Sequence, residues 1–381
     1  MIRLGMIGCG TMAGSFLHGL RALEPRLQIT AAVDIRLERA EKAVEGIPGA
    51  KAFTDYRDAL EHVDAVIVAL PHDLHHRVGL DCLAAGKHVL MEKPLANTEA
   101  ECLDLIHAAE ASGRVLSVGY VMRHDPLWTE MGRLIHEQVF GTVFQVSIWT
   151  EQLTDLTRGD WLGQRMRVGG GQLFSHGCHY IDLLLHWLGR PVDGTHTGTN
   201  LGTPWMEMEG TSNVAIRFAS GALGYHFGTW GARGTRLGYA VHAHCTEGLL
   251  ELNHREGTLM LHRNPGGGDL PALQAALEAG AQVESSSCTL LMKRETGGKA
   301  TNAEVTELLD CIETGRQPIA NPRVALQSLR VIWKLYDAEE RGAVADLRGL
   351  GLDEFVDAPI LGEAGQALLP IPERASFVVA P

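Results

Sequence analysis

The amino-acid sequence predicts a protein of two domains: an α/β domain built on a parallel sheet, followed by an α+β domain with a large, mostly antiparallel open sheet. The chain has 381 residues, which is long for a single hydrophobic core. Up to residue 120, short apolar runs alternate with helical stretches, a pattern typical of βαβ units. After Pro126, several short strands follow one another with glycine at the turns, which is typical of antiparallel pairing.

The first domain is expected to cover residues 1–125. Its strands are almost wholly apolar, as expected when helices cover both faces of a sheet. We expect strands at Ile2–Ile7, Ile29–Val33, Ala65–Ala69, His88–Met91 and Val115–Gly119. We expect helices at Met12–Leu23, Leu37–Val44, His75–Ala85 and Thr98–Ser112.

The second domain is expected to cover residues 126–345, and residues 346–381 are expected to form a C-terminal tail. A helix at Leu127–Glu137 and a strand at Thr142–Thr150 begin the second domain. Further strands are expected at Ser212–Phe218, Gly224–Trp230, Ala240–His244, Gly248–Leu252 and Thr258–His262. Residues 264–300 look like a loop with one short helix. Two late helices, which can pack back on the first domain, are expected at Asn302–Thr314 and Pro322–Arg341.

Composition and charge exclude several classes of protein. The formal net charge is −13, so the chain lacks the basic surface that nucleic acids and anionic membranes require. No apolar run approaches the ~20 residues that span a bilayer, and the N-terminal MIRLGMIGCG lacks the features of a signal peptide. Seven scattered cysteines without a CxxC pair fit reduced thiols. We therefore expect a cytoplasmic protein that binds neither nucleic acid nor membrane.

The segment GCGTMAG, residues 8–14, lies between the first strand and the first helix, where a dinucleotide-binding motif belongs. Gly8 is expected to make the tight turn, and Gly10 to let a pyrophosphate approach the helix N-terminus. Asp34 ends the second strand, 24 residues after Gly10, where a carboxylate would bind ribose hydroxyls and repel a 2′-phosphate. We expect a Rossmann domain with NAD as cofactor. NADP stays an alternative, because the guanidinium of Arg36 could bind its 2′-phosphate. A glycine turn without a nucleotide is the structural alternative.

A lysine stands at the end of another strand, in the sequence GKHVLMEKPL of residues 86–95. Lys93 would then lie at the carboxyl edge of the parallel sheet, where such folds bind ligands. Beside a nicotinamide ring, its ammonium group could donate a hydrogen bond to a substrate oxygen and stabilise the charge that develops during hydride transfer. A lysine that caps a helix explains the spacing as well.

Residues 169–182, GGGQLFSHGCHYID, combine three glycines with two histidines and an aspartate. On a helix, His176, His179 and Asp182 share one face, and His186 follows. The other side of this helix is expected to be buried through Leu183, Leu184, Trp187 and Leu188. An active site, a metal site and a polar stripe are all compatible with the spacing. A zinc ion would suit His-x-x-His, but a nicotinamide already accepts the electrons, so we expect no metal.

The sequence resembles the Gfo/Idh/MocA oxidoreductases in three segments: GCGTMA, PHDLHHRVGLDCLAAGKHVLMEKPLA at residues 71–96, and GGGQLFSHGCHYID. The resemblance covers residues 1–345 in order and includes GYVMRHDP at residues 119–126. It implies a Rossmann domain followed by an open sheet that carries the substrate and usually the oligomer interface. It also implies hydride transfer between a nicotinamide and a sugar, a cyclitol or a related polyol.

The resemblance implies roles for individual residues. The EKP lysine corresponds to Lys93 and the GxHxxD histidine to His179, and in the family these two flank the reacting carbon. His179 would take the hydroxyl proton as general base. His75 matches a histidine beside the cofactor, and Arg123 matches an arginine near the nicotinamide and the substrate. The residues expected to contact the cofactor are Gly8, Gly10, Thr11, Met12, Asp34, Arg36, Leu70, His72, His75, Glu92 and Lys93.

The sequence departs from the family pattern at one position of this site. The pattern GGGxLxDxGxHxxD has an aspartate four residues before the histidine, whereas this chain has Ser175 there with His176 beside it. Serine forms hydrogen bonds but cannot hold charge. Either His176 or Asp182 takes over part of the proton relay, or His179 works with less assistance. The residues expected to contact the substrate are Arg123, Trp161 as a pocket wall, Ser175, His176 and Asp182.

Together these observations predict an NAD(P)-dependent dehydrogenase that acts on a secondary hydroxyl of a sugar, a sugar derivative or a cyclitol. One alternative is a ligand sensor that keeps the fold and the nucleotide without catalysis, although the presence of Lys93 and His179 disfavours it. Another is a reductase of an imine or of a dihydrodiol-type substrate. Because an open sheet leaves a face uncovered, we expect a homodimer or homotetramer.

Overall fold

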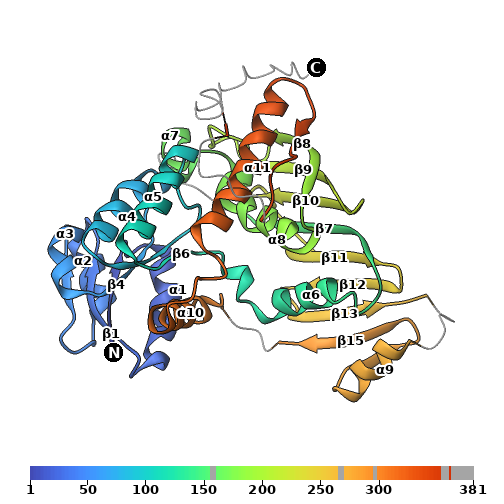
Figure 1. Cartoon of the computed structure of the whole chain (residues 1–381), viewed down its shortest axis with the longest axis horizontal. Coiled ribbons are helices and arrows are strands. Elements are labelled where there is room, and N and C mark those ends of the chain that lie inside the picture. Colours follow the sequence, from blue (N-terminus) through green and yellow to red (C-terminus); the bar gives the residue numbers. More distant parts are fainter. Residues whose placement is uncertain (155–159, 265–269, 295–297, 353–359, 362–381) are drawn as a thin grey trace.

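The structure, a computed structural model, describes residues 1–154, 160–264, 270–294, 298–352 and 360–361. Two sheets form the frame of the molecule, and helices surround the first sheet and lie between the two (Figure 1). One sheet is wholly parallel and the other is mostly antiparallel. This architecture confirms the predicted fold class. The domain boundaries after residues 125 and 345 stay predictions.

The first sheet has six parallel strands in the order β3-β2-β1-β4-β5-β6. Its strands are β1 (Ile2–Ile7), β2 (Leu27–Val33), β3 (Lys51–Phe53), β4 (Ala65–Val68), β5 (His88–Met91) and β6 (Leu116–Val118). Its helices are α1 (Thr11–Leu20), α2 (Leu37–Val44), α3 (Tyr56–Ala59), α4 (His75–Ala84) and α5 (Glu99–Ser112). The strand order reverses between β1 and β4, and folds of this kind bind ligands outside the carboxyl ends of the strands at such a reversal.

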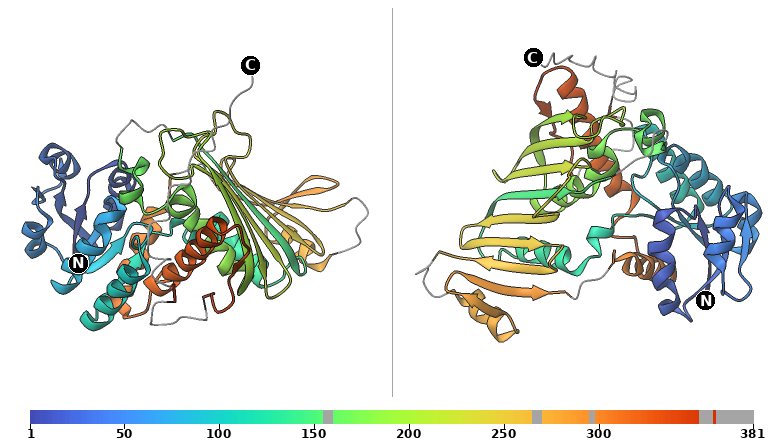
Figure 2. Two further views of the ribbon diagram at one scale, coloured as in Figure 1. Left: turned by 90° about the horizontal axis from the view of Figure 1, so that it is seen from above. Right: turned by 180° about the vertical axis from the view of Figure 1, so that it is seen from behind.

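The second sheet has ten strands in the order β14-β15-β13-β12-β11-β7-β10-β9-β8-β16. They are β7 (Val143–Glu151), β8 (Pro191–Thr199), β9 (Thr211–Phe218), β10 (Leu223–Thr229), β11 (Tyr239–Cys245), β12 (Gly248–Asn253), β13 (Thr258–His262), β14 (Gln282–Ser285), β15 (Cys288–Lys293) and β16 (Ala345–Asp346). Only β7 and β10 pair in parallel among the described strands of this sheet. The helices α6 (Pro126–His136), α8 (Cys178–Leu188) and α11 (Pro322–Glu340) lie on the side toward the first sheet (Figure 2).

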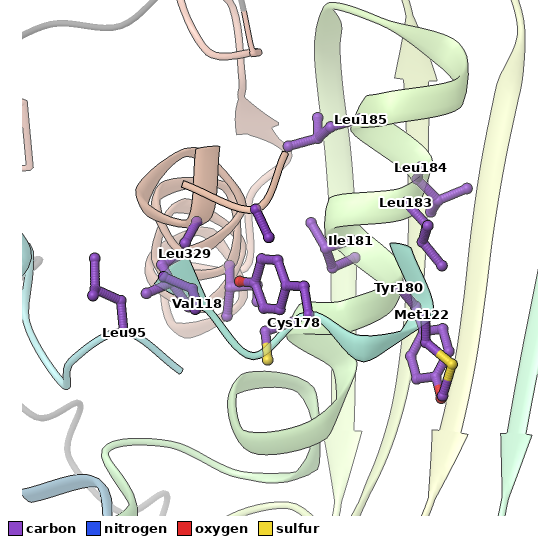
Figure 3. Packing of buried hydrophobic residues seen from close by; sticks show 14 of the residues in the cluster. Leu95, Val118, Met122, Cys178, Tyr180, Ile181, Leu183, Leu184, Leu185 and Leu329 are labelled. Atoms are coloured by element: carbon purple, nitrogen blue, oxygen red, sulfur yellow. The ribbon is translucent and has the colours of Figure 1, made fainter. Parts of the chain in front are cut away.

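The helix α8 is buried on nearly all sides, because it lies between the second sheet and α11. Ile181 and Leu185 point toward α11, whereas Tyr180 and Leu184 point toward the sheet (Figure 3). The four residues that were predicted to be buried, Leu183, Leu184, Trp187 and Leu188, are buried. Each fully buried leucine contributes roughly 2 kcal/mol. This packing holds α8 firmly and fixes the direction of the side chains on its first turn.

The two late helices connect the second half of the chain to the first sheet. The helix α10 (Thr301–Thr314) packs on α1, and Val305 and Leu308 share a buried cluster with Phe16. At α11, the hydroxyl oxygens of Ser328 and Tyr120 lie 2.7 Å apart. Within the described residues, no helix combines the length and the apolar character needed to cross a membrane.

The structure differs from the prediction in several elements. The expected helix Met12–Leu23 changes after α1 into a 3-10 turn at Arg21–Leu23. The region 264–300 contains the expected short helix, α9 (Pro271–Glu278), but also the unpredicted strands β14 and β15. The strands β3 and β8 were also missed, because β3 is short and β8, PVDGTHTGT, has little apolar periodicity. The expected C-terminal tail lies largely outside the described residues.

Candidate active site

The turn after β1 faces the N-terminus of α1 at the reversal of the strand order. Gly8 has a φ of +93°, and a Cβ atom there would lie 2.2 Å from the carbonyl oxygen of Ala69. Only glycine fits this turn. A Cβ atom at Gly10 would meet nothing within 4 Å, so space remains in front of the helix N-terminus. A pyrophosphate fits such a place, where backbone N–H groups point outward.

Asp34 is fixed at the end of β2 by two backbone donors. Its Oδ2 accepts a hydrogen bond from the N–H of Cys9 at 3.0 Å, and its Oδ1 accepts one from the N–H of Arg36 at 2.9 Å. Asp34 is half-buried, and each carboxylate oxygen keeps a second lone pair for a ribose hydroxyl. The Arg36 side chain is exposed at the start of α2. These residues fit the adenosine half of a dinucleotide.

His75 joins the loop after β4 to the loop that carries Lys93. Its Nδ1 lies 2.8 Å from the carbonyl oxygen of Pro94, and its Nε2 lies 3.0 Å from that of Leu70. Burial lowers the pKa of His75 to about 4, so the ring is neutral at physiological pH and donates to one of these two carbonyls. We interpret His75 as a residue that positions Lys93.

His72 joins the same loop to the second half of the chain. Its Nδ1 lies 2.8 Å from the carbonyl oxygen of Val168, just before the glycine-rich motif. Its ring meets the half-buried Trp161 edge-on, with 4.8 Å between ring centroids. Trp161 therefore stands beside the predicted cofactor residues, while its contact with a substrate stays a prediction.

Lys93 follows β5 and reaches the second half of the chain. Its Nζ donates to the backbone carbonyl oxygen of Ser175 at 2.8 Å. Ser175 belongs to a π-helical turn, Leu173–Gly177, that leads into α8, and such turns are frequent at functional sites. Ser175, at which the chain departs from the family pattern, is buried, and its backbone carbonyl is the atom that the EKP lysine contacts. The structure thus brings two separate motifs together.

His179 lies on the first turn of α8, and its side chain is buried. Its Nδ1 is buried and has no hydrogen-bond partner within the described part of the chain. Burial lowers the pKa of His179 well below its usual value, and the charge of Lys93 lowers it further. The ring of Tyr120 lies 5.6 Å away, centroid to centroid. A neutral imidazole with an unpaired nitrogen can accept a proton.

His176 differs from His179 because both of its ring nitrogens have protein neighbours. The Nε2 of Gln172 lies 3.3 Å from its Nδ1, and the hydroxyl of Tyr239 lies 3.4 Å from its Nε2. Burial lowers the pKa of His176 well below its usual value. The rings of His176 and His179 lie 6.1 Å apart, so the predicted pair is close. The described residues include no group of three or more His, Cys, Asp or Glu side chains arranged to hold a metal ion.

Arg123 and Asp182, both expected at the substrate, are paired with each other. The Nε and one terminal nitrogen of Arg123 donate to the two carboxylate oxygens of Asp182 at 2.6 and 3.0 Å. The two side chains are 6% and 0% exposed, so this is a buried bidentate ion pair. We interpret Asp182 as a residue that positions α8. A substrate contact of either residue stays a prediction.

Two residues that sequence reasoning did not find hold the glycine-rich segment. The Glu209 carboxylate accepts hydrogen bonds from the N–H of Leu173 at 3.1 Å and from the hydroxyl of Tyr336 at 2.7 Å. The Tyr336 oxygen accepts from the N–H of Gly171 at 3.2 Å. Burial raises the pKa of Glu209. No local motif marks Glu209 or Tyr336, because their role depends on contacts between distant segments.

The fold, with its dinucleotide-binding turn after β1, is that of two-domain oxidoreductases that use a nicotinamide dinucleotide. The chain belongs to the Gfo/Idh/MocA family. Residues 2–120 match the family model described as "Oxidoreductase family, NAD-binding Rossmann fold", and residues 128–251 match the GFO/IDH/MocA C-terminal domain. These matches confirm the predicted family and the NAD-binding class of its first domain.

Curated relatives support the same grouping. The chain is 34% identical over 148 residues to inositol 2-dehydrogenase of Pseudarthrobacter chlorophenolicus, across 38% of this chain and 44% of that protein. It is 30% identical over 193 residues to scyllo-inositol 2-dehydrogenase (NADP(+)) of Bacillus subtilis, across 50% of this chain and 52% of the relative. The matched stretches therefore span about half, or less, of these relatives.

Solved structures match most of the chain at lower identity. An aldose-aldose oxidoreductase from Caulobacter crescentus, complexed with glycerol, has a TM-score of 0.76 at 24% identity, over 91% of this chain and 99% of that one. Levoglucosan dehydrogenase in complex with NADH has a TM-score of 0.77 at 19% identity, over 91% and 99%. At these identities the likeness shows a shared fold.

Proposed function

We propose that the protein is an NAD(P)-dependent dehydrogenase that transfers hydride between the nicotinamide and a secondary hydroxyl or ketone of a sugar, a sugar derivative or a cyclitol. One observation carries the proposal: the ammonium group of Lys93 donates to the carbonyl oxygen of Ser175, in the turn that leads to His179. Burial, and then the charge of Lys93, lower the pKa of that histidine. A cationic donor and a neutral base from two different motifs therefore share one site. The inositol dehydrogenases among the relatives support a polyol substrate.

The two residues have complementary roles in this reaction. A bound nicotinamide supplies the hydride acceptor or donor. His179 takes the proton of the substrate hydroxyl, because its lowered pKa keeps the ring neutral. Lys93 donates one N–H to the carbonyl oxygen of Ser175. Its other two N–H groups can stabilise the negative charge that develops on the substrate oxygen. The same groups allow the reverse reduction.

The proposed cofactor-binding role of the first domain rests on the glycine turn after β1 and on the carboxylate of Asp34. Gly10, Thr11 and Met12 would hold a pyrophosphate at the N-terminus of α1, and Asp34 would bind the adenosine ribose. Glu92 is buried beside Lys93, whose backbone N–H donates to its carboxylate at 3.2 Å. Burial raises the pKa of Glu92, and the charges of Lys93 and Lys299 oppose this shift. We propose NAD as the preferred cofactor, with NADP tolerated through Arg36.

A turnover screen tests this function against its alternatives. Purified protein is incubated with NAD or NADP and with panels of sugars, cyclitols, imines and dihydrodiols, and the nicotinamide absorbance is followed. We expect reduction of the cofactor by at least one sugar or cyclitol. Turnover of only imines or dihydrodiols would support the reductase alternative. Cofactor binding without any turnover would support the ligand sensor and overturn the enzyme.

We also propose that the protein is cytoplasmic and assembles as a homodimer or homotetramer. Helices cover the second sheet on the side of α6, α8 and α11, so the opposite side is the place for a second copy (Figure 2). Light scattering coupled to gel filtration measures the mass in solution. A monomer at micromolar concentration would contradict the assembly.

A further inference from the structure

We propose that Lys299 binds the pyrophosphate of the dinucleotide and supplies the phosphate-binding turn with a cation from the second half of the chain. This inference rests on the proposed nicotinamide cofactor. The Nζ of Lys299 lies 3.1 Å from the Sδ of Met12. Met12 belongs to the first turn of α1, where the pyrophosphate is expected to approach.

The phosphate-binding turn lacks a basic side chain of its own. Residues 8–20 contain neither lysine nor arginine, and their single histidine, His18, lies in the last turn of α1. The N-terminus of a helix supplies only about half a positive charge, whereas a pyrophosphate bridge is a dianion. The whole chain has a net charge of −13, so long-range attraction does not help. An ammonium group from elsewhere in the fold completes the charge balance.

Lys299 is exposed to solvent, yet desolvation by the surrounding protein lowers the pKa of its ammonium group. Three charged groups also act on this ammonium group: Glu92 and Glu304 raise its pKa, and Lys93 lowers it. The charge of Lys299 also lowers the pKa values of His176 and His179. Lys299 therefore contacts the phosphate-binding turn and influences the pKa values of the histidines in the proposed hydride-transfer site. A dinucleotide bound as proposed would extend between these two places.

The ammonium group of Lys299 is available for an anion. Among the described residues its hydrogen-bond acceptor is the thioether sulfur of Met12, which is a weak acceptor. The position of Lys299 is fixed by the helix α10, which begins two residues later. The hydroxyl of Thr301 donates to the carbonyl oxygen of Ser15 at 2.8 Å, and α10 packs along α1. Lys299 is thus held beside α1, and within the described residues its hydrogen bond goes to the Met12 sulfur, while Glu92 and Glu304 act on it only through their charge.

The test compares three variants by calorimetric titration with NAD and with ADP-ribose, which both contain the pyrophosphate. Lys299→Met keeps the length of the side chain and removes its charge, and Lys299→Arg keeps the charge. Lys293→Met removes an exposed lysine from the same segment and is the matched control. We expect Lys299→Met to raise both dissociation constants about tenfold, consistent with the loss of one charge-assisted hydrogen bond. Lys299→Arg should stay within a few-fold of the wild type, and Lys293→Met should match it.

Salt and pH give independent readouts. The difference between the wild type and Lys299→Met should shrink as salt is added, because salt screens the ion pair. Wild-type affinity should fall as pH rises into the alkaline range, where Lys299 loses its proton, and Lys299→Arg should not show this fall. Equal dissociation constants for Lys299→Met and Lys293→Met would overturn the proposal, as would a Lys299→Met defect confined to turnover. A wild-type protein that binds neither dinucleotide would overturn the proposed function itself.

Discussion

The ammonium group of Lys93 donates to the backbone carbonyl oxygen of Ser175 at 2.8 Å. This bond joins the carboxyl end of β5 to the π-helical turn that precedes α8. The two halves of the proposed site, one at the end of β5 and one on the turn into α8, are therefore connected by the residue expected to stabilise the reacting oxygen. The relationship makes Lys93 and Ser175 the first positions to test.

Lys93→Met should reduce turnover to about 1% of the wild-type rate or less, while NAD binding survives. Removing one preorganised donor to a developing oxyanion lowers kcat by about 10²- to 10³-fold, and the phosphate and ribose contacts do not involve this side chain. Steady-state kinetics and calorimetric titration with NAD measure the two effects separately. Lys293→Met is the charge-matched control and should change neither. Full activity in Lys93→Met would remove Lys93 from the mechanism.

His179→Asn should lower kcat by about 10²- to 10⁴-fold, the usual contribution of a general base. The wild-type pH profile provides a second measurement. Oxidation needs the neutral imidazole, and burial and Lys93 lower the pKa of His179 below 6.5. Activity should therefore be lost, as pH falls, only below pH 6.5. An acid limb at or above that value, or an active His179→Asn variant, would show that another group accepts the proton.

Ser175→Asp should move either the pH profile or the substrate preference. A carboxylate beside Lys93 and one helical turn before His179 would stabilise the imidazolium form and raise the pKa of His179. The acid limb should then shift to higher pH. Ser175→Asn adds similar volume without charge and is the control. Identical profiles and substrate ranges in all three proteins would mean that the departure from the family pattern has no functional effect.

Asp182→Ala should lower the free energy of unfolding by about 3–5 kcal/mol, because it leaves the buried guanidinium of Arg123 without its partner. The double variant Arg123→Met/Asp182→Leu removes both charges and should recover a large part of this loss. Urea unfolding followed by circular dichroism measures each protein. Asp346→Ala breaks an exposed ion pair with Arg348 and should leave stability unchanged. A double variant as unstable as Asp182→Ala would contradict the buried-pair interpretation.

The sequence predicted the parts of the fold whose apolar pattern is strong. All four residues of β4, AVIV, are buried, and a continuous apolar run of this kind predicts a covered strand. By contrast, all four residues of β14, QVES, are exposed. A strand of this kind forms because β15 pairs with it, and no local pattern records that pairing. Elements with a strong local apolar pattern were thus predicted, and elements without one were missed.

The same limit applies to the site. Lys93 and His179 stand in motifs that the sequence displays directly, so they could be predicted as candidates. Lys299 and Met12 are 287 residues apart, and Tyr336 and Glu209 are 127 residues apart. Their relationships exist only after α10 and α11 pack onto the rest of the fold. A single sequence contains no local signal for such contacts.

Isotope transfer tests the central claim most directly. A sugar or cyclitol that turns over is prepared with deuterium at the oxidised carbon, and the reduced cofactor is analysed by mass spectrometry and NMR. Direct hydride transfer predicts one deuterium at C4 of the nicotinamide, on a single face of the ring, and about 1% as much labelled cofactor or less in the Lys93→Met reaction over the same time. A reduced cofactor without deuterium, or no reduction by any sugar or cyclitol despite NAD binding, would contradict the account.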